Sequence, residues 1–165
     1  MVHFSLVERS GGRIVSRSPG WLRQLAADLN RLLSLTPGWD GRRALPISET
    51  AVRALTAVLV PIMDVPPLHV PQEQPDIFPL PDGGLQAEWH AGGEDVEVEV
   101  EGDGATYVVV RDASDLVVTE GEVDLTALET TSPSAADEAS RERLLAVRRA
   151  VERLTESVVA ARRGR

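Results

Sequence analysis

The stretch between residues 85 and 120 constrains the fold of this chain more than any other feature of its sequence. Short strand-like runs alternate there with turns rich in Gly, Asp and Ser. Loops of this length join antiparallel neighbours, so the stretch predicts a four-stranded antiparallel meander. The four runs cover residues 85–90, 95–101, 105–111 and 116–120, and residues 77–80 offer a fifth strand.

The second of these runs predicts which side of the sheet is buried. Successive side chains of a strand point to opposite faces, so alternating residue types separate onto two faces. A shift of the strand pairing by one residue would bury three glutamates, and the register is therefore well specified. We expect a dry face formed by Val96, Val98 and Val100, and an acidic, solvated face formed by Glu97, Glu99 and Glu101.

Two amphipathic helices are predicted before the sheet. Ser18-Pro19 is typical of a helix start, and it precedes a helix expected over residues 19–35. Ser48 is a second N-cap residue, before a helix over residues 49–60 that Pro61 should bend or end. Both helices should pack their apolar faces on the dry face of the sheet. The first helix would present Leu22, Leu25, Leu29 and Leu32, and the second Val52, Leu55, Leu59 and Ile62.

A long amphipathic helix is the last predicted element. Its apolar residues follow the alternating spacing of three and four that is typical of a bundle or coiled-coil seam. The seam could pack on the same domain or bind another chain, and the sequence leaves both alternatives open. Its residues are Leu144, Val147, Val151, Leu154 and Val158.

The predicted fold class is α+β. Two N-terminal helices pack on a four- to five-stranded antiparallel meander, and the long amphipathic helix follows at the C-terminus. The predicted divisions are an N-terminal arm or hairpin at residues 1–17, a core domain at 18–126, a connector at 127–140 and the C-terminal helix at 141–165.

Composition narrows the environment and the class of partner. The chain has no cysteine, no apolar run long enough to span a membrane and no N-terminal signal pattern, so we expect a cytoplasmic protein without a membrane partner. All 17 basic residues are arginine, which is typical of a high-GC bacterial genome. The net charge is −9, and residues 65–133 hold sixteen acidic residues against Arg111 alone. An acidic sheet argues against direct nucleic-acid binding.

Four short motifs link the helices to the sheet in a fixed order. They are Trp39-Asp40-Gly41, Pro46-Ile47-Ser48, Asp82-Gly83-Gly84 and Glu88-Trp89. In this combination residues 30–125 resemble a group of small bacterial proteins with a Trp-Asp-Gly connector and an antiparallel sheet. The resemblance implies the architecture and no known activity. It does not cover the C-terminal helix.

Candidate catalytic and metal-binding residues are sparse. His3, His69 and His90 lie far apart in the sequence, so we expect neither a metal site nor a cofactor. Asp40 and Glu88 each neighbour a tryptophan, and such a pair could serve a small hydrolase or a carbohydrate-binding domain. A structural role is the stronger expectation, with Trp39 and Trp89 filling the joint between helices and sheet.

The sequence therefore predicts a non-catalytic protein-binding accessory or adaptor subunit of a bacterial complex. Its partner would be another protein chain, in a hetero-complex or a homo-oligomer. One alternative is an acidic, antitoxin-like inhibitor or immunity protein that neutralises a basic partner. The other is the small hydrolase or carbohydrate-binding domain that uses Asp40 and Glu88. The predicted partner-binding residues are the seam, Leu144, Val147, Val151, Leu154 and Val158, and the acidic row, Glu97, Glu99 and Glu101.

Overall fold

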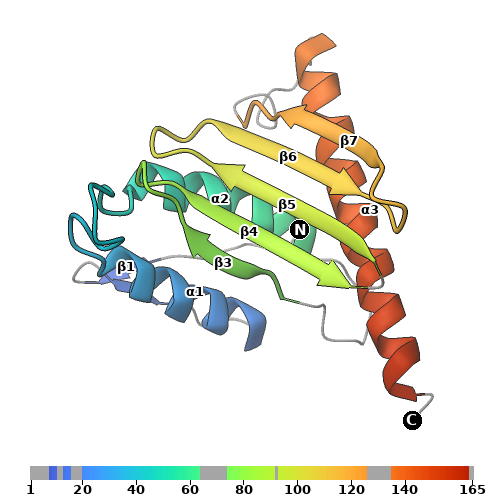
Figure 1. The fold of residues 1–165 in the computed structure, drawn as a ribbon, viewed down its shortest axis with the longest axis horizontal. Coiled ribbons are helices and arrows are strands. Elements are labelled where there is room, and N and C mark those ends of the chain that lie inside the picture. The colour runs from blue at the N-terminus through green and yellow to red at the C-terminus, as the bar shows by residue number, and fades with distance from the viewer. Residues whose placement is uncertain are drawn as a thin grey trace.

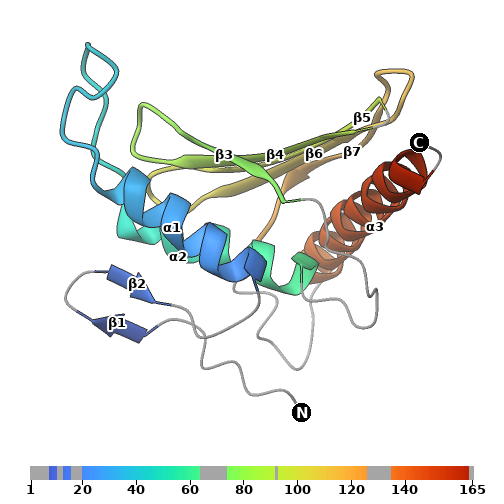
Figure 2. The same cartoon turned by 90° about the horizontal axis from the view of Figure 1, so that it is seen from below.

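The structure is a computed structural model that describes residues 8–10, 13–15, 20–63, 74–91, 93–125 and 135–163. These residues form an α+β fold in which three helices lie on one side of a five-stranded sheet (Figures 1 and 2). In chain order the elements are β1 (Glu8–Ser10), β2 (Arg13–Val15), α1 (Gly20–Leu33), α2 (Glu49–Met63), β3 (Asp76–Pro79), β4 (Leu85–Ala91), β5 (Glu94–Val100), β6 (Thr106–Arg111), β7 (Val117–Glu122) and α3 (Ala135–Arg163).

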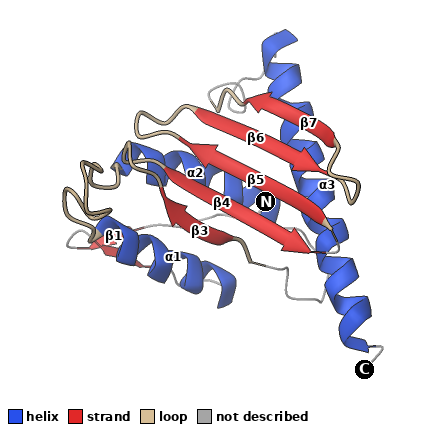
Figure 3. Cartoon of the chain, in the orientation of Figure 1, coloured by secondary structure: helices blue, strands red, loops and turns tan. Residues whose placement is uncertain are grey.

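The large sheet is an antiparallel meander in the order β3-β4-β5-β6-β7 (Figure 3). This confirms the predicted strands, including the fifth one before Leu85. The register places Val96 opposite Trp89 and Val110, so large apolar side chains meet across three strands on one face. That inner face is almost fully buried, with Leu85, Ala87, Trp89, Val96, Val98, Val100, Val108 and Val110 all at 2% exposure or less.

Helix α2 covers part of the inner face, as predicted, and contacts β4 and β5, whereas α1 lies on the same side of the sheet beside β3, with its leucines in the same hydrophobic core (Figures 1 and 2). The leucines of α1 that recur at three- and four-residue spacing are buried, and so is the corresponding stripe of α2. Helix α2 continues through Pro61 to Met63, two residues beyond Pro61, where the sequence predicted a bend or an end. Pro61 is exposed, whereas Ile62 and Met63 are buried in the core. Packing of these two side chains therefore outweighs the backbone hydrogen bond that proline removes.

Helix α3 crosses beneath the sheet and contacts β4, β5, β6 and β7 (Figures 1 and 2). It begins at Ala135, so the predicted connector at residues 127–140 is too long, because residues 135–140 are helical. The buried Ser140 side chain explains this early start. Its Oγ accepts a hydrogen bond of 3.0 Å from the backbone N–H of Asp124, which ties the first turns of α3 to the chain leaving β7.

A short hairpin precedes α1. Strands β1 and β2 pair with Ser10 opposite Arg13, and β2 contacts α1 on the side away from the sheet (Figure 2). Of the two alternatives for residues 1–17, the described part is therefore a hairpin. The remainder of that segment lies outside the described residues.

The connector between α1 and α2 is fastened to the turn between β3 and β4. The N–H of Leu45 donates to the carbonyl of Pro81 at 2.8 Å, and the N–H of Ser48 donates to the carbonyl of Gly83 at 2.9 Å. Trp39 lies in this connector, where its Nε1 donates to the carbonyl of Leu45 at 3.1 Å. The predicted position of Trp39 between helices and sheet is thus wrong, because its indole closes the connector, whereas Trp89 lies in the core as predicted.

Asp82 links two turns at the same end of the sheet. Its carboxylate accepts hydrogen bonds from the N–H groups of Gly84 and Gly102, each at 2.9 Å. A Cβ at Gly84 would collide with the carbonyl of Val100, and a Cβ at Gly102 would collide with that of Asp82. The Asp-Gly-Gly motif is therefore a structural joint, since only glycine permits this close approach of the backbones.

Strand β7 forms one edge of the sheet, and α3 covers part of that edge. Arg143 donates from Nη1 to the carbonyl of Glu122 at 2.7 Å and from Nε to the carbonyl of Glu120 at 3.3 Å. Unpaired edge carbonyls are templates for pairing with another chain. The guanidinium of Arg143 thus occupies acceptors that a further strand would need.

Candidate functional site

The predicted seam of α3 is largely buried within this chain. Val147 and Val151 are fully buried, Leu154 is 2% exposed, and Leu144 is partly buried against the same core. The side chain of Val158 lies outside the described residues. Of the two alternatives for the seam, the structure places these residues against the sheet of the same domain. The described part of the seam is therefore not a free surface for another chain.

The opposite face of the sheet, which we call the outer face, is the candidate site. The described helices and the β1–β2 hairpin all lie on the inner side, and none of them covers it (Figure 2). Cross-strand partners share a face, so the register defines its members. They are Asp76, Phe78, Gln86, Glu88, His90, Asp95, Glu97, Glu99, Tyr107, Val109, Arg111, Val117, Glu120 and Glu122.

Negative charge is concentrated on the outer face. Glu88 lies directly opposite Glu97, and Asp76 lies opposite Glu88 on its other side, so three acidic residues form one cross-strand row. Like charges in directly opposite positions destabilise a sheet. Among the described residues, no ion pair joins Asp76, Glu97, Glu99, Glu120 or Glu122 to a cation. The outer face therefore carries charge that the described part of the chain leaves uncompensated.

The predicted acidic row lies where the sequence placed it. Glu97 and Glu99 are on the outer face, and Glu99 is exposed. Glu101 is also exposed and follows β5 at the start of the turn toward β6. Sequence reasoning missed Asp76, Glu120 and Glu122, which extend this charge over neighbouring strands. Strand alternation could have identified them, because each follows or precedes an inward-facing residue of its strand.

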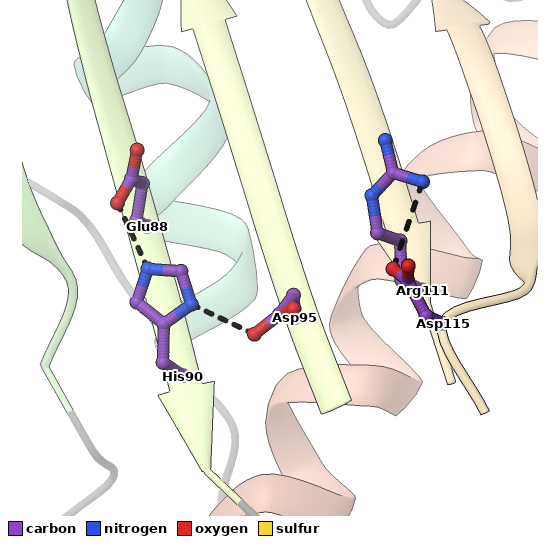
Figure 4. A network of polar contacts seen from close by, with 5 residues as sticks. All are labelled: Glu88, His90, Asp95, Arg111 and Asp115. Carbon is purple, nitrogen blue, oxygen red and sulfur yellow. Dashed lines mark hydrogen bonds and ion pairs between the residues drawn. The ribbon is translucent and has the colours of Figure 1, made fainter. Parts of the chain in front are cut away.

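His90 holds two of the carboxylates at one end of the outer face (Figure 4). Its Nδ1 lies 2.7 Å from Asp95 Oδ1 on β5, and its Nε2 lies 2.8 Å from Glu88 Oε2 on its own strand. Both ring nitrogens donate together only in the imidazolium form. The hydrogen bonds to Asp95 and then Glu88 raise the pKa of His90 above its ordinary value of 6.5, against a smaller opposing effect of burial. His90 thus neutralises part of the face at low pH.

Exposed apolar side chains accompany the charges. Phe78 is 46% exposed and Tyr107 is 45% exposed, and they lie in one cross-strand row with Gln86, Glu99 and Glu122. Val117 is exposed at the margin, opposite Arg111. Aromatic side chains are enriched at protein interfaces because they bury a large area at a small entropic cost. The sequence analysis assigned no binding role to Phe78 or Tyr107, although both alternate with inward-facing residues of their strands.

Asp40 and Glu88 take separate local roles. Asp40 Oδ1 accepts hydrogen bonds from the N–H groups of Arg42 at 2.8 Å and Ala44 at 3.2 Å, which stabilise the connector before α2. Glu88 instead contacts His90 on the outer face. The local hydrogen bonds of Asp40 and Glu88 therefore account for the position of each carboxylate separately, and neither depends on the other residue.

The structure and the comparisons add three findings. No group of three or more His, Asp, Glu or Cys side chains within the described ranges is arranged to hold a metal ion. No described helix combines the length and apolar character that crossing a membrane would require. Comparisons with protein-family models, with curated proteins and with solved structures found no match to this chain.

Proposed function

We propose that this protein is a non-catalytic protein-binding module and that its outer face docks on a basic surface of another protein. The observation that supports this proposal is the row of Asp76, Glu88 and Glu97 on a sheet face that no described helix or hairpin covers. Glu97 and Asp76 have no cationic partner among the described residues. A basic protein surface would relieve their mutual repulsion and would accelerate association by long-range attraction.

The exposed aromatic residues support the same conclusion. Charge alone makes a surface attractive to any cation, whereas Phe78 and Tyr107 provide apolar area that can be buried on docking. The seam of α3 is already occupied by the core, so the adaptor role is assigned to the outer face. An inhibitor of a basic enzyme would use the same surface, and the two roles differ in what docking does to the partner.

The test compares two pairs of substitutions that remove equal charge from different surfaces. One variant carries Glu97→Gln and Glu99→Gln on the outer face, and the other carries Glu138→Gln and Glu142→Gln on α3. Glu138 and Glu142 are exposed, and neither forms an ion pair within the described ranges. The probe is an oligoarginine peptide, and affinity is measured by titration calorimetry over a series of salt concentrations.

We expect the outer-face variant to weaken peptide binding about two- to thirtyfold and to reduce its salt dependence, because two contacts of about 0.2–1 kcal/mol each are lost. The α3 variant should bind nearly as well as the natural sequence. Equal weakening by both variants would show that net charge alone attracts the peptide, and it would refute docking on the outer face.

A further inference from the structure

The outer face has one position where an exposed aromatic ring lies between two glutamates. Tyr107 on β6 is directly opposite Glu99 on β5 and directly opposite Glu122 on β7. Cross-strand partners in these positions have Cβ atoms about 4.5–5.5 Å apart, so both carboxylates can reach a group placed over the ring. Among the described residues of the outer face, the other exposed Phe or Tyr side chain is Phe78, whose cross-strand partner is Gln86.

These three side chains are available to a partner. Tyr107 is 45% exposed, and Glu99 and Glu122 are both exposed. Neither glutamate is joined to a cation in the ion pairs of the described residues. Arg143 contacts the backbone carbonyl of Glu122 from the sheet edge.

The chemistry of this arrangement favours a guanidinium over an ammonium group. A guanidinium is planar and weakly hydrated, so it can stack on a tyrosine ring while its edge donates paired hydrogen bonds to a carboxylate. A lysine ammonium is a strongly hydrated point charge that gains less from the ring. With a carboxylate on each side of Tyr107, a stacked guanidinium would find an acceptor in either direction along the row.

We propose that Tyr107, Glu99 and Glu122 form a recognition site for an arginine side chain on a basic protein partner. This inference rests on the proposed docking function and adds to it the identity of the recognised side chain. The negative charge of this site attracts the positive charge of arginine and repels phosphate groups, so the occupant is a protein and not a nucleic acid. Phe78 lies in the same row but faces Gln86, and it therefore serves as an internal control.

The experiment uses the full chain and two short synthetic peptides, one of alternating serine and arginine and one of alternating serine and lysine. Titration calorimetry at low ionic strength should show the arginine peptide binding about two- to fivefold more tightly, as expected for an exposed cation–π contact of about 0.5–1 kcal/mol. Tyr107→Leu should abolish this preference, and Phe78→Leu should leave it intact. Glu99→Gln with Glu122→Gln should weaken binding of both peptides.

A spectroscopic measurement supports the test without a substitution. Tyr107 is the only tyrosine of the chain, so labelling with 3-fluorotyrosine gives a single fluorine resonance. The arginine peptide should shift this resonance more than the lysine peptide at equal saturation. Equal shifts, or a preference for arginine that survives Tyr107→Leu, would overturn the proposed arginine site.

The outcomes separate this inference from the proposed function. If both peptides bind equally and Glu97→Gln with Glu99→Gln weakens both, docking on the outer face stands and the arginine site is rejected. If those substitutions change the affinity for neither peptide, the proposed docking function is rejected as well. Sedimentation equilibrium tests a second copy of the chain as the occupant. Self-association that is lost in Tyr107→Leu would overturn the assignment to a different protein.

Discussion

Gly121 on the edge strand β7 lies against the guanidinium of Arg143 on α3. A Cβ at position 121 would come within 2.5 Å of Arg143 Nε and 2.8 Å of Cζ, and the φ angle of Gly121 is 141°. Glycine thus has two roles here, since it adopts this backbone conformation and leaves space for the cation that occupies the carbonyls of Glu120 and Glu122.

Replacing Gly121 should therefore destabilise the protein and uncover the β7 edge of the sheet. Gly121→Ala is expected to lower the free energy of unfolding by about 1–3 kcal/mol, through backbone strain and displacement of Arg143. Urea denaturation measures this loss. Gly20→Ala is the matched control, because a Cβ at Gly20 meets nothing within 4 Å. If Gly121→Ala is as stable as Gly20→Ala, the contact with Arg143 has no energetic role.

Asp82 should contribute more to stability than other turn aspartates. Asp82→Ala leaves the N–H groups of Gly84 and Gly102 without their acceptor, at a cost of about 1–3 kcal/mol. Asp103→Ala is the comparison, because Asp103 accepts a hydrogen bond from Ala105 within its own turn. The difference in unfolding temperature between the two variants measures the contribution of the Asp82 link between the two turns. Equal losses would contradict this role.

The stability of the sheet should depend on the protonation of His90. Because the folded-state pKa of His90 is raised, its contribution to stability is fully present below the unfolded-state pKa, near 6.5, and is lost as pH rises through the folded-state pKa. The stability difference between the natural sequence and His90→Gln should therefore shrink with rising pH across this window. Urea denaturation over a pH series measures it, and NMR titration of the His90 ring gives the folded-state pKa. A difference that is constant with pH would rule out the protonated link between Glu88 and Asp95.

Removing a charge from the crowded row should stabilise the free protein. Glu97→Gln eliminates repulsion with Glu88 directly opposite, so we expect the free energy of unfolding to rise by about 0.2–1 kcal/mol, most clearly at low salt. Glu142→Gln on α3 should have little effect. The same substitution at Glu97 weakens peptide binding in the proposed function, so stability and binding should change in opposite directions. A loss of stability in Glu97→Gln would show that the carboxylate has a favourable contact in the folded chain.

The C-terminal helix should be necessary for folding. Deleting residues 135–165 removes the buried side chains of Val147, Val151 and Leu154 and uncovers the inner face of the sheet. Truncating one buried leucine, as in Leu154→Ala, should already cost about 2–5 kcal/mol. Circular dichroism and urea denaturation of the deletion variant should show loss of the cooperative transition. A cooperatively folded remainder would mean that residues 18–126 form an independent domain.

The helices and strands could be predicted because their signals are local. Valine and glutamate alternate with a period of two in β5, and leucines recur at three and four in α1, so the buried faces follow directly from the sequence. The end of α2 could not be predicted in this way. Burial of Ile62 and Met63 depends on packing against distant elements, and that packing carries the helix past Pro61.

The candidate site was less predictable because it depends on register. Glu88 and His90 are two residues apart on one strand, so their common face is evident from the sequence. The position of Tyr107 between Glu99 and Glu122 depends on how two hairpins align, including the irregularity between Val110 and Arg111. The seam of α3 illustrates the same limit, because an apolar stripe has the same sequence pattern whether its cover comes from the same chain or another.

The one-by-one alternation of inward and outward residues along β5 and β6 has an evolutionary consequence. Positions that hold the sheet to its helices and positions that face outward are interleaved, so outward residues can be exchanged without repacking the interior. Divergence among descendants of this chain should concentrate at every second position of these strands. A new specificity could be engineered at those positions alone.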